Sequence, residues 1–554
     1  MSRAWLFLAV MGALGLSVAG ACAAEAQQNL KYRWVFVWRQ LSRPEEVDKL
    51  IADLPRAAAA GYNGLVLRWN VAPEKKEALK AAAAQYHFDL IPTVMGSGAP
   101  ERDLMEGLPV RDALFVAHNG TATISADPAV SLPGGEFEEA KGDTFAGWDS
   151  QEQPGVCTFQ DTEVKHGGAS AIRMDNLAKA SPDLGCYVGK TLKVSPFREY
   201  RVSVWVKTDQ LEAEEPGVII RGEGGSFRNL CYSPARIRPT QDWRQLFLVF
   251  NSLDNTSVRI SFGAWAPKSG RLWWDDAKLE EVGLLNVVRR AGTPVTVKGE
   301  NGTVYEEGKD YEAISDPDLN ISRAGHAPPV IHLTPMSRIT EGQRLRVSYY
   351  HPVLIEYGGA ACLAEPKLYE HYREEITRIN DEIHPPAFFM SHDEIRIANW
   401  CETCRGKHET PGQLLADGVK QCVDIIRAIR PDAKIWVWSD MFDPFHNAHE
   451  KYYLVNGTWA ASWEGLPKEV GIANWAGHLA GKNCYWFAMR GHEQVLCGYY
   501  DNPEDNNGEK MRAWLKAGEG TSVVGAMYTT WRSSYDPLVT WAEGVWGKPR
   551  QPGK

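Results

Sequence analysis

The sequence predicts an α/β protein: a (β/α)8 barrel of the TIM type, interrupted after its third strand by an all-β jelly-roll sandwich and a smaller β-rich segment. Two observations support this prediction. Strand and helix patterns alternate near both ends of the chain, which implies parallel strands joined by helical crossovers. Between these parts the helical periodicity disappears for more than about 200 residues, and short runs of alternating apolar and polar residues replace it.

The N-terminal part contains three strand patterns separated by two amphipathic helix patterns. No G-x-G-x-x-G motif follows the first strand, so the simplest dinucleotide-binding fold is excluded. Three such units open a barrel or a doubly wound sheet. The strands are expected at 32–38, 64–69 and 88–94, and the helices at 44–60 and 73–85.

Alternation of helices and strands returns after residue 365. Three strands before the insertion and five after it make eight, the number that closes a barrel of this kind. We expect helices at 367–380 and 411–429, and strands at 387–392, 434–438, 470–474, 483–487 and 523–529.

The middle of the chain has the two-residue alternation of an antiparallel sandwich. Its clearest strand patterns lie at 200–206, 245–250, 257–262 and 270–276. A further β-rich stretch follows at 292–350. We therefore divide the chain into a signal peptide at 1–24, a first barrel part at 28–107, a sandwich at 131–283, a β-rich connecting segment at 284–350 and a second barrel part at 351–548.

The N-terminus has the features of an export signal. Arg3 supplies a positive charge, residues 5–18 are mostly apolar, and small residues follow. The apolar stretch is shorter than the about 20 residues that span a bilayer. We expect a secreted or periplasmic protein without an integral membrane span. Lipid anchoring at Cys22 is the alternative.

Composition restricts the partners. The 554-residue chain carries a net charge of −10 and no basic stripe, which argues against a nucleic-acid partner. It also contains 21 Trp. Aromatic rings fill cores, but they also stack on the apolar faces of sugars by the same burial of apolar surface. The excess of Trp therefore favours an oligosaccharide or polysaccharide partner, and we expect no cofactor.

Functional groups of such a barrel gather at the carboxyl ends of its strands. These ends carry aromatic, acidic, Arg and Asn residues, a mixture that suits sugar hydroxyls flanked by stacking rings. The candidates for substrate binding are Arg39, Arg68, His392, Trp438, Asp440, Trp475, Tyr500, Asp501, Tyr528 and Trp531.

Asp393 and Glu394 directly follow an apolar strand. Glycoside hydrolysis needs one carboxyl group to protonate the leaving oxygen and a second group to stabilise the developing positive charge. Neighbouring strand residues point to opposite faces, so this pair can serve one site only where the strand breaks into its loop. The alternative is a solvated acidic pair that caps the next helix.

The motif F-F-M-S-H-D-E, at residues 388–394, resembles the end of the fourth barrel strand in the family 20 glycoside hydrolases, the β-N-acetylhexosaminidases. The resemblance covers 32–94 and 369–546, and includes W-V-W-S-D-M and Y-T-T-W. The family's H-x-G-G-D-E is M-S-H-D-E here, which leaves the substrate open. The resemblance implies that Glu394 is the general acid and base, and that Asp393 orients a 2-acetamido group that attacks the anomeric carbon.

The resemblance also suggests roles for other residues. Trp438, Trp475 and Trp531 are expected to form the pocket wall, and Tyr500 to direct its hydroxyl at the acetamido oxygen. The middle domain resembles the jelly-roll carbohydrate-binding modules of bacterial polysaccharide enzymes. G-G-E-F-E at 134–138, V-S-V-W-V-K at 202–207 and W-W-D-D at 273–276 carry this resemblance.

Two functional alternatives stay open: a hydrolase of another β-linked sugar on the same barrel, and a non-catalytic glycan-binding surface protein. Cys401 and Cys404, followed by His408, have the spacing of half a zinc site. A second pair of ligands is not evident, so a local disulfide or unpaired loop cysteines are favoured and no metal site is predicted.

Overall fold

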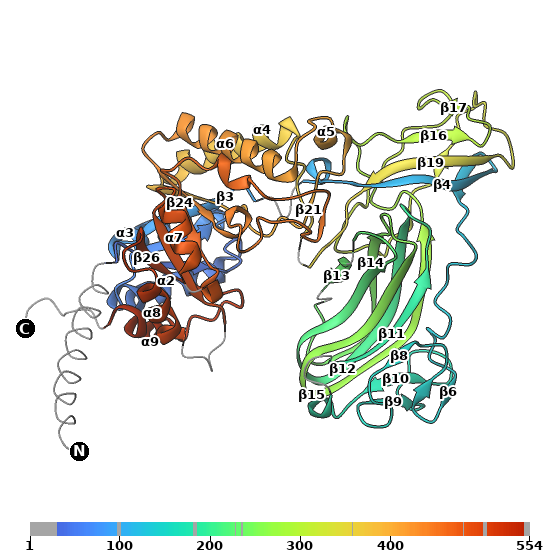
Figure 1. Cartoon of the computed structure of the whole chain (residues 1–554), viewed down its shortest axis with the longest axis horizontal. Coiled ribbons are helices and arrows are strands. Elements are labelled where there is room, and N and C mark those ends of the chain that lie inside the picture. The colour runs from blue at the N-terminus through green and yellow to red at the C-terminus, as the bar shows by residue number, and fades with distance from the viewer. Residues whose placement is uncertain are drawn as a thin grey trace, which may run out of the picture.

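The computed structural model describes residues 30–547, except 97–100, 181–184, 228, 234–235, 357, 480 and 502–506. The expected signal peptide at 1–24 lies outside the described residues. Figure 1 shows two lobes: the barrel with its helices, and the inserted β-sheets. No helix in the described part of the chain is long and apolar enough to cross a membrane.

The first lobe contains a closed barrel of eight parallel strands. The last strand pairs with the first, with Val35 opposite Tyr528, and this pairing closes the sheet. In order around the barrel, the strands are β1 (Tyr32–Val37), β2 (Gly64–Arg68), β3 (Asp89–Val94), β20 (Ala387–Met390), β22 (Lys434–Trp438), β24 (Gly471–Asn474), β25 (Gln494–Tyr499) and β26 (Val523–Thr529).

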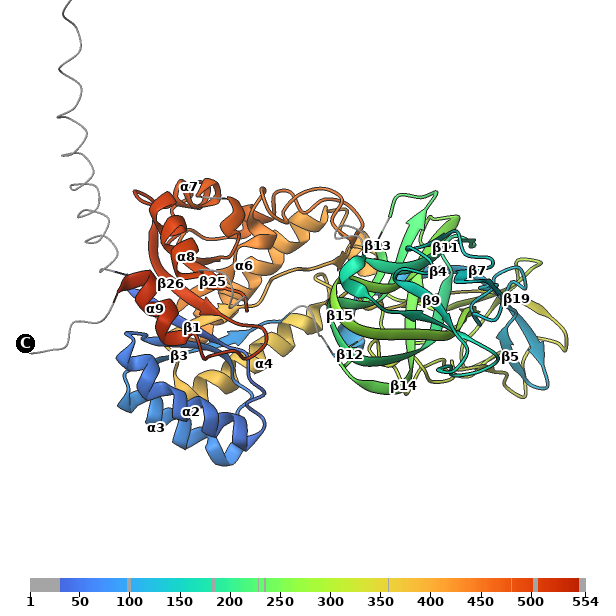
Figure 2. The ribbon, with the colours of Figure 1, turned by 90° about the horizontal axis from the view of Figure 1, so that it is seen from below.

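Helices lie outside the barrel (Figure 2). The longest, α6, begins with a capping box in which the Thr410 hydroxyl accepts from the Gln413 backbone N–H and the Gln413 side chain accepts from the Thr410 backbone N–H. The helices are α2 (Pro44–Ala59), α3 (Lys76–Gln85), α4 (Pro366–Ile383), α5 (Glu402–Arg405), α6 (Pro411–Ile429), α7 (Lys482–Ala488), α8 (Asn507–Ala517) and α9 (Leu538–Trp546).

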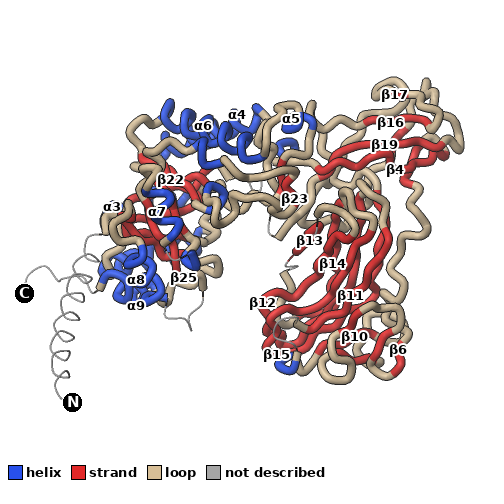
Figure 3. The backbone as a smooth tube through the Cα atoms, in the orientation of Figure 1, coloured by secondary structure: helices blue, strands red, loops and turns tan. Residues whose placement is uncertain are grey.

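The fold class predicted from the sequence, a (β/α)8 barrel of the TIM type with an insertion, is wrong. The described chain is mostly β, and strand dominates the whole inserted lobe (Figure 3). The helical layer of the barrel is also incomplete. Between β22 and β24 the described chain forms 3-10 turns and the short strand β23 (Leu454–Val455), with no α-helix. Pro444, Gly457 and Gly465 interrupt any helical pattern in this stretch.

The predicted strand at 483–487 is also wrong. These residues belong to helix α7, and the seventh barrel strand is β25. Asn483, Cys484 and Phe487 are buried at the spacing of a helix face. The aromatic run Tyr-Trp-Phe is typical of strands, but its burial follows the three-to-four-residue period of a helix.

The insertion leaves the barrel after β3 and returns before α4. Its first and last long strands, β4 (Leu108–His118) and β19 (Arg344–His351), pair antiparallel, with Leu108 opposite His351. The two ends of the insertion therefore run side by side. They form one six-stranded sheet with β5 (Thr121–Ile124), β16 (Thr296–Gly299), β17 (Val304–Tyr305) and β18 (Ile331–His332).

The rest of the insertion is an eight-stranded antiparallel sheet dominated by two long strands, β12 (Glu199–Glu223) and β15 (Ser257–Val282). These two pair along most of their length with several register shifts. The other strands are β8 (Ser150–Gln151), β9 (Thr158–Asp161), β10 (Ala171–Met174), β11 (Cys186–Lys193), β13 (Asn229–Ser233) and β14 (Gln241–Asn251). Two further strand pairs stand apart: β6 (Ala140–Lys141) with β7 (Thr144–Phe145), and β21 (Ile397–Ala398) with β23.

Buried polar contacts join the two sheets of the insertion. The Tyr349 hydroxyl donates to Glu199 Oε2 at 2.6 Å, and the Asn251 amide donates to the Pro109 carbonyl at 3.0 Å. Separating the sheets would leave the groups joined by these two hydrogen bonds unpaired, at a cost of about 1–3 kcal/mol each. The domain boundaries expected at 131–283 and 284–350 stay predictions.

Aromatic side chains fill the barrel interior. The rings of Trp34 and Trp436 meet edge to face with centroids 5.0 Å apart, and those of Phe389 and Trp438 meet at 4.9 Å. Gly471 makes room for this packing, because a Cβ atom there would lie 2.3 Å from Cε3 of Trp436. The barrel interior is therefore a packed core up to the carboxyl ends of the strands.

We predict that Gly471→Ala destabilises the fold by about 1–3 kcal/mol, because the added methyl group must displace the Trp436 ring. Thermal unfolding measures this loss. Gly96→Ala is the control, since a Cβ atom at Gly96 would meet no atom within 4 Å. An equal unfolding temperature for the two variants would contradict the packing described.

Candidate active site

The two-residue period of the barrel strands decides which side chains reach the barrel mouth. In β20, Ala387 and Phe389 belong to the interior cluster, whereas Phe388 and Met390 pack toward the helices. Asp393 lies in the loop after β20, and it lines a cavity at the mouth. The sequence prediction that this residue is catalytic stays a prediction.

This mouth cavity has a volume of about 460 Å³, within the range of about 300–1,000 Å³ that is usual for small-molecule sites. Asp393 lies on its wall, and Arg68 lies at the end of β2. Three Trp side chains supply apolar surface. They are Trp38, Trp438 and Trp531.

The three Trp side chains form a connected wall. The rings of Trp38 and Trp531 meet edge to face at 5.0 Å, and Trp438 lies 6.3 Å from Trp531. Trp38 and Trp531 stay 49% and 39% exposed, so their faces are accessible to a ligand. Exposed aromatic faces beside a carboxyl group suit a sugar ring, which has apolar C–H faces and polar edges.

Glu394 and Asp440 form a hydrogen-bonded pair next to Asp393. The Glu394 backbone N–H donates to Asp440 Oδ2 at 2.8 Å. Asp440 is fully buried, and it also accepts from Asn447 Nδ2 at 2.9 Å and from Trp475 Nε1 at 3.2 Å. Glu394 has a left-handed φ of 46°, a conformation that non-glycine residues adopt in a minority of cases.

All three carboxyl groups bind protons more tightly than usual. Burial, followed by the charges of Asp440 and Glu394, raises the pKa of Asp393 to about 7. Burial also raises the pKa values of Glu394 and Asp440. The negative charges of neighbouring carboxyl groups add to the effect of burial at Asp393, because each disfavours ionisation of the other. Shifted carboxyl groups of this kind are typical of acid–base sites.

Arg396 provides the nearest positive charge. Its Nη2 lies 2.8 Å from Glu394 Oε2, and it also pairs with Glu356. The Tyr453 hydroxyl donates to Glu356 Oε1 at 2.6 Å. Even with this guanidinium beside it, the pKa of Glu394 stays above its ordinary value, because burial outweighs the charge of Arg396. Glu394 is thus both oriented by a cation and able to hold a proton.

Several predicted binding residues lie elsewhere. Arg39 points away from the barrel interior, pairs with Asp53 at 2.6 Å and stacks on Tyr535. His392 is buried against helix α6, with Nε2 3.8 Å from Cys422 Sγ, and burial lowers its pKa to about 4. Arg39 follows the end of β1 and His392 follows the end of β20, and neither side chain lines the mouth cavity.

Tyr528 likewise packs outward, stacks on Tyr499 and donates its hydroxyl to the Ser534 carbonyl. Asp501 accepts from the backbone N–H of Arg532 at 3.1 Å, so it supports the loop that carries Trp531. Both side chains therefore stabilise the barrel rim and do not line the mouth cavity.

Trp475 and Tyr500 line a neighbouring cavity of about 770 Å³. Trp475 contacts the carboxyl group of Asp440, as described above. The Tyr500 hydroxyl donates to the Cys497 carbonyl at 3.0 Å, so the structure does not direct it at the mouth cavity. Their rings lie 6.4 Å apart, and neither residue lines the mouth cavity.

The sequence prediction missed Trp38, Arg396, Glu356 and Asn447. The signal for Trp38 was present, because it continues the inward series of Trp34 and Phe36 in β1. The other three lie in loops, and Glu356 comes from the end of the insertion. No periodicity connects such residues to a strand end.

Comparisons with known proteins return distant likenesses only. No family model and no curated protein matches the chain. The chitobiase of Flavobacterium johnsoniae matches with 16% identity over 36% of this chain and 32% of its own, at a TM-score of 0.24. The β-N-acetylhexosaminidase of Bacteroides fragilis matches with 15% identity over 35% of this chain and 42% of its own, at a TM-score of 0.24.

A xylan-binding carbohydrate-binding module of Paenibacillus barcinonensis matches with 17% identity over 28% of this chain and 96% of its own, at a TM-score of 0.19. This chain thus spans less than half of each of the two enzymes above. Carbohydrate-binding modules and hexosaminidases are among its structural neighbours, but at such TM-scores the function must be argued from the site.

We predict that Asp393→Asn changes how stability depends on pH. The pKa of Asp393 is about 7 in the folded chain, against about 3.9 for an unfolded Asp. The folded state therefore binds an extra proton between about pH 4 and 7, and stability falls as pH rises through this window. The variant lacks this titrating group. The difference between its unfolding temperature and that of wild type should therefore be more favourable to the variant at pH 8 than at pH 5.

The matched control is Asp432→Asn, at an exposed position in the turn before β22. Scanning calorimetry of the three proteins at both pH values gives the comparison. If Asp393→Asn and Asp432→Asn follow the same pH dependence, Asp393 is not the buried proton-binding group described here.

Proposed function

We propose that this protein is a glycoside hydrolase that removes terminal β-linked N-acetylhexosamine from glycans by a retaining, substrate-assisted mechanism. One observation carries the proposal: Asp393 faces a Trp-lined cavity at the barrel mouth and adjoins Glu394, and the pKa values of both carboxyl groups are raised. The proposed site of action is outside the cytoplasm, in keeping with the export signal expected at 1–24.

Glu394 is the proposed general acid and base. Burial raises its pKa, which is the direction required of an acid that protonates the glycosidic oxygen. After the leaving group departs, the same carboxylate takes a proton from water, which attacks the anomeric carbon. The ion pair with Arg396 fixes the orientation of the carboxyl group between these two steps.

Asp393 is the proposed partner of the substrate's acetamido group. Its carboxylate accepts the amide N–H and favours attack of the carbonyl oxygen on the anomeric carbon. The carbon–oxygen bond to the leaving group breaks as the new bond forms, and an oxazolinium ring results. Water then reopens this ring, so two inversions give net retention. No enzyme nucleophile is needed in this scheme.

The mouth cavity supports recognition of a single terminal sugar. Trp38, Trp438 and Trp531 offer aromatic faces, and Arg68 offers hydrogen-bond donors to outer hydroxyl groups. Below them the packed aromatic core closes the barrel, so a chain cannot pass through. A site closed at one end favours removal of terminal residues over cleavage inside a polymer. We propose that the inserted sheet holds the rest of the glycan, as its resemblance to carbohydrate-binding modules implies.

We predict that the purified protein hydrolyses aryl β-N-acetylglucosaminides or β-N-acetylgalactosaminides, and that Glu394→Gln lowers kcat by about 10²–10⁴-fold, the usual contribution of a general acid–base. The substrates tested also include an aryl β-glucoside and an aryl β-galactoside. The loss should be larger for a disaccharide than for a nitrophenyl glycoside, because a poor leaving group depends more on protonation.

Glu519→Gln is the control, because Glu519 is exposed and precedes β26 at the opposite end of the barrel. This variant should keep wild-type rates. Activity confined to glucoside or galactoside would favour a hydrolase of another β-linked sugar. Glycan binding without any turnover, unchanged in Glu394→Gln, would favour a binding protein.

Fluorination of the acetamido group tests substrate assistance separately. We predict that kcat/KM falls from N-acetyl through fluoroacetyl and difluoroacetyl to trifluoroacetyl glycosides, by more than about tenfold in total, a loss of over about 1.4 kcal/mol. Each fluorine withdraws electrons from the attacking carbonyl oxygen. Rates that stay constant along the series would rule out the acetamido group as the nucleophile.

A further inference from the structure

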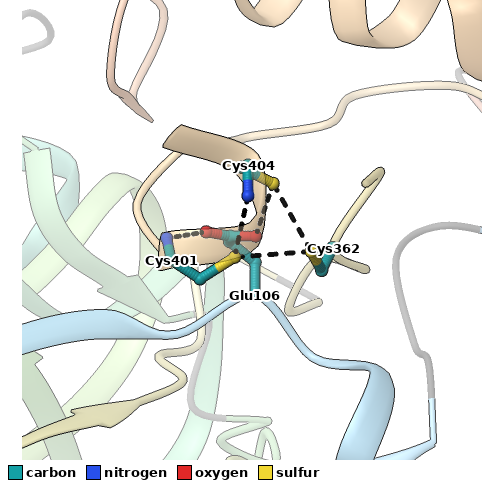
Figure 4. A group of neighbouring side chains, drawn as sticks. All are labelled: Glu106, Cys362, Cys401 and Cys404. Carbon is teal, nitrogen blue, oxygen red and sulfur yellow. Dashed lines mark hydrogen bonds between the residues drawn. The ribbon is translucent and has the colours of Figure 1, made fainter. Parts of the chain in front are cut away.

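Three thiols and a carboxylate converge outside the candidate active site. Figure 4 shows the side chains of Glu106, Cys362, Cys401 and Cys404 pointing toward one another. Their ligand atoms all lie within 4.8 Å of one another. Cys362 Sγ lies 3.4 Å from Sγ of both Cys401 and Cys404, and Cys404 Sγ lies 3.4 Å from Glu106 Oε2. We call this group the cysteine cluster.

The distances match those that a small tetrahedral metal site requires. A zinc ion binds thiolate sulfur at about 2.3 Å, which places two sulfur ligands about 3.8 Å apart. The observed sulfur separations need to expand by only a few tenths of an ångström to admit the ion. The C-x-x-C spacing of Cys401 and Cys404, on the first turn of α5, is also a spacing found in structural zinc sites.

Because the cluster is buried, its ionised groups destabilise the folded state unless a cation balances their charge. Cys362 and Cys401 are 0% exposed, and Cys404 and Glu106 are 1% exposed. A buried carboxylate needs a charged or hydrogen-bonding partner. Arg290 supplies one positive charge nearby, and its Nη1 is shared with Glu365 at 3.5 Å. A divalent ion bound by the thiolates and Glu106 would balance most of the remaining negative charge.

Backbone groups already orient the ligands. Glu106 Oε1 accepts from the N–H groups of Trp400 at 2.8 Å and Cys401 at 2.7 Å, which leaves Oε2 directed into the cluster. The Cys404 N–H donates to Cys401 Sγ at 3.5 Å. Such outer hydrogen bonds hold metal ligands in position and stabilise their ionised forms.

A disulfide accounts for less of this arrangement. None of the nine cysteines in the described part of the chain is disulfide-bonded. A bond between any two of the three thiols would leave the third thiol and the Glu106 carboxylate buried without a role. A metal ion uses all four groups at once.

We propose that Glu106, Cys362, Cys401 and Cys404 bind one zinc-type divalent ion in a closed structural site. Thiolate ligands select soft ions such as zinc over magnesium or calcium. Binding displaces the thiol protons to solvent and involves no change of oxidation state. This site departs from the sequence prediction of no metal, and it is independent of the proposed glycosidase activity.

The ligands come from three segments of the chain. Glu106 lies where the insertion leaves the barrel, and Cys362 lies where it returns before α4. Cys401 and Cys404 end the loop that begins with Asp393 and Glu394. The ion therefore ties both ends of the insertion to the loop of the candidate active site, and it stabilises their relative positions.

Metal analysis of the full chain tests the proposal. The protein is produced with added zinc and purified without chelators and without a histidine tag, because such a tag binds metal itself. We expect about one zinc per chain in wild type and in Cys497→Ser, which removes a buried thiol outside the cluster. Cys362→Ser and Cys404→Ser should retain less than about a fifth of that amount, because each removes one of four ligands.

X-ray absorption at the zinc edge keeps the test decisive if the variants fail to fold. We expect three sulfur ligands at about 2.3 Å and one oxygen ligand at about 2.0–2.2 Å in the wild-type protein. A metal-free wild-type protein overturns the proposal. Zinc bound only through nitrogen and oxygen also overturns it, as does peptide mapping that finds a disulfide between two of the three cysteines.

Discussion

The packed aromatic interior of the parallel barrel is the constraint on which the rest of the structure depends. Trp34, Phe389, Trp436 and Trp438 point inward. Trp34 contacts Trp436 across the barrel, and Phe389 contacts Trp438 on the neighbouring strand. Since strand side chains alternate, these rings also fix which later residues of each strand point inward. Trp38 directly follows β1 and stacks on Phe36, and Asp393 lies in the loop that follows β20.

Burial then determines the chemistry of the mouth. Asp393 and Asp440 lie against the aromatic core, where desolvation disfavours their charged forms. The protein offsets part of this cost with hydrogen bonds to Asp440 and with Arg396 beside Glu394. Arg396 is in turn held by Glu356, at the end of the insertion. The insertion is thus connected to the candidate active site through a chain of charged side chains.

The sequence predicted those parts of the structure that depend on a local pattern of apolar residues. Seven of the eight barrel strands lie where the apolar runs predict them, and Asp393 and Glu394 were identified from their place after β20. Arg39, His392 and Tyr528 were predicted because they lie at or just after strand ends and carry charged or aromatic groups. Arg39 and His392 lie in the loops after β1 and β20 and make contacts away from the mouth cavity, and Tyr528 packs outward within β26. A position at a strand end therefore does not by itself show which side chains line a barrel site.

Other features could not be read from local patterns. The prediction of the fold class was wrong because periodicity indicates which elements exist. It did not indicate that the described stretch between β22 and β24 lacks an α-helix. The cysteine cluster needs Glu106, which precedes Cys401 by 295 residues, and Cys362, which precedes it by 39. The antiparallel pairing of β4 with β19 and the bridge between Met105 and Ala361 bring the segments of Glu106 and Cys362 together.

The most direct test of the central claim is a crystal structure of Glu394→Gln bound to an aryl N-acetyl-β-glucosaminide. The proposed function predicts the sugar ring in the mouth cavity against the exposed faces of Trp38 and Trp531, with its acetamido group at Asp393 and its glycosidic oxygen beside residue 394. A sugar bound only to the inserted sheet, with an empty barrel mouth, would contradict the claim that the barrel mouth is the catalytic site.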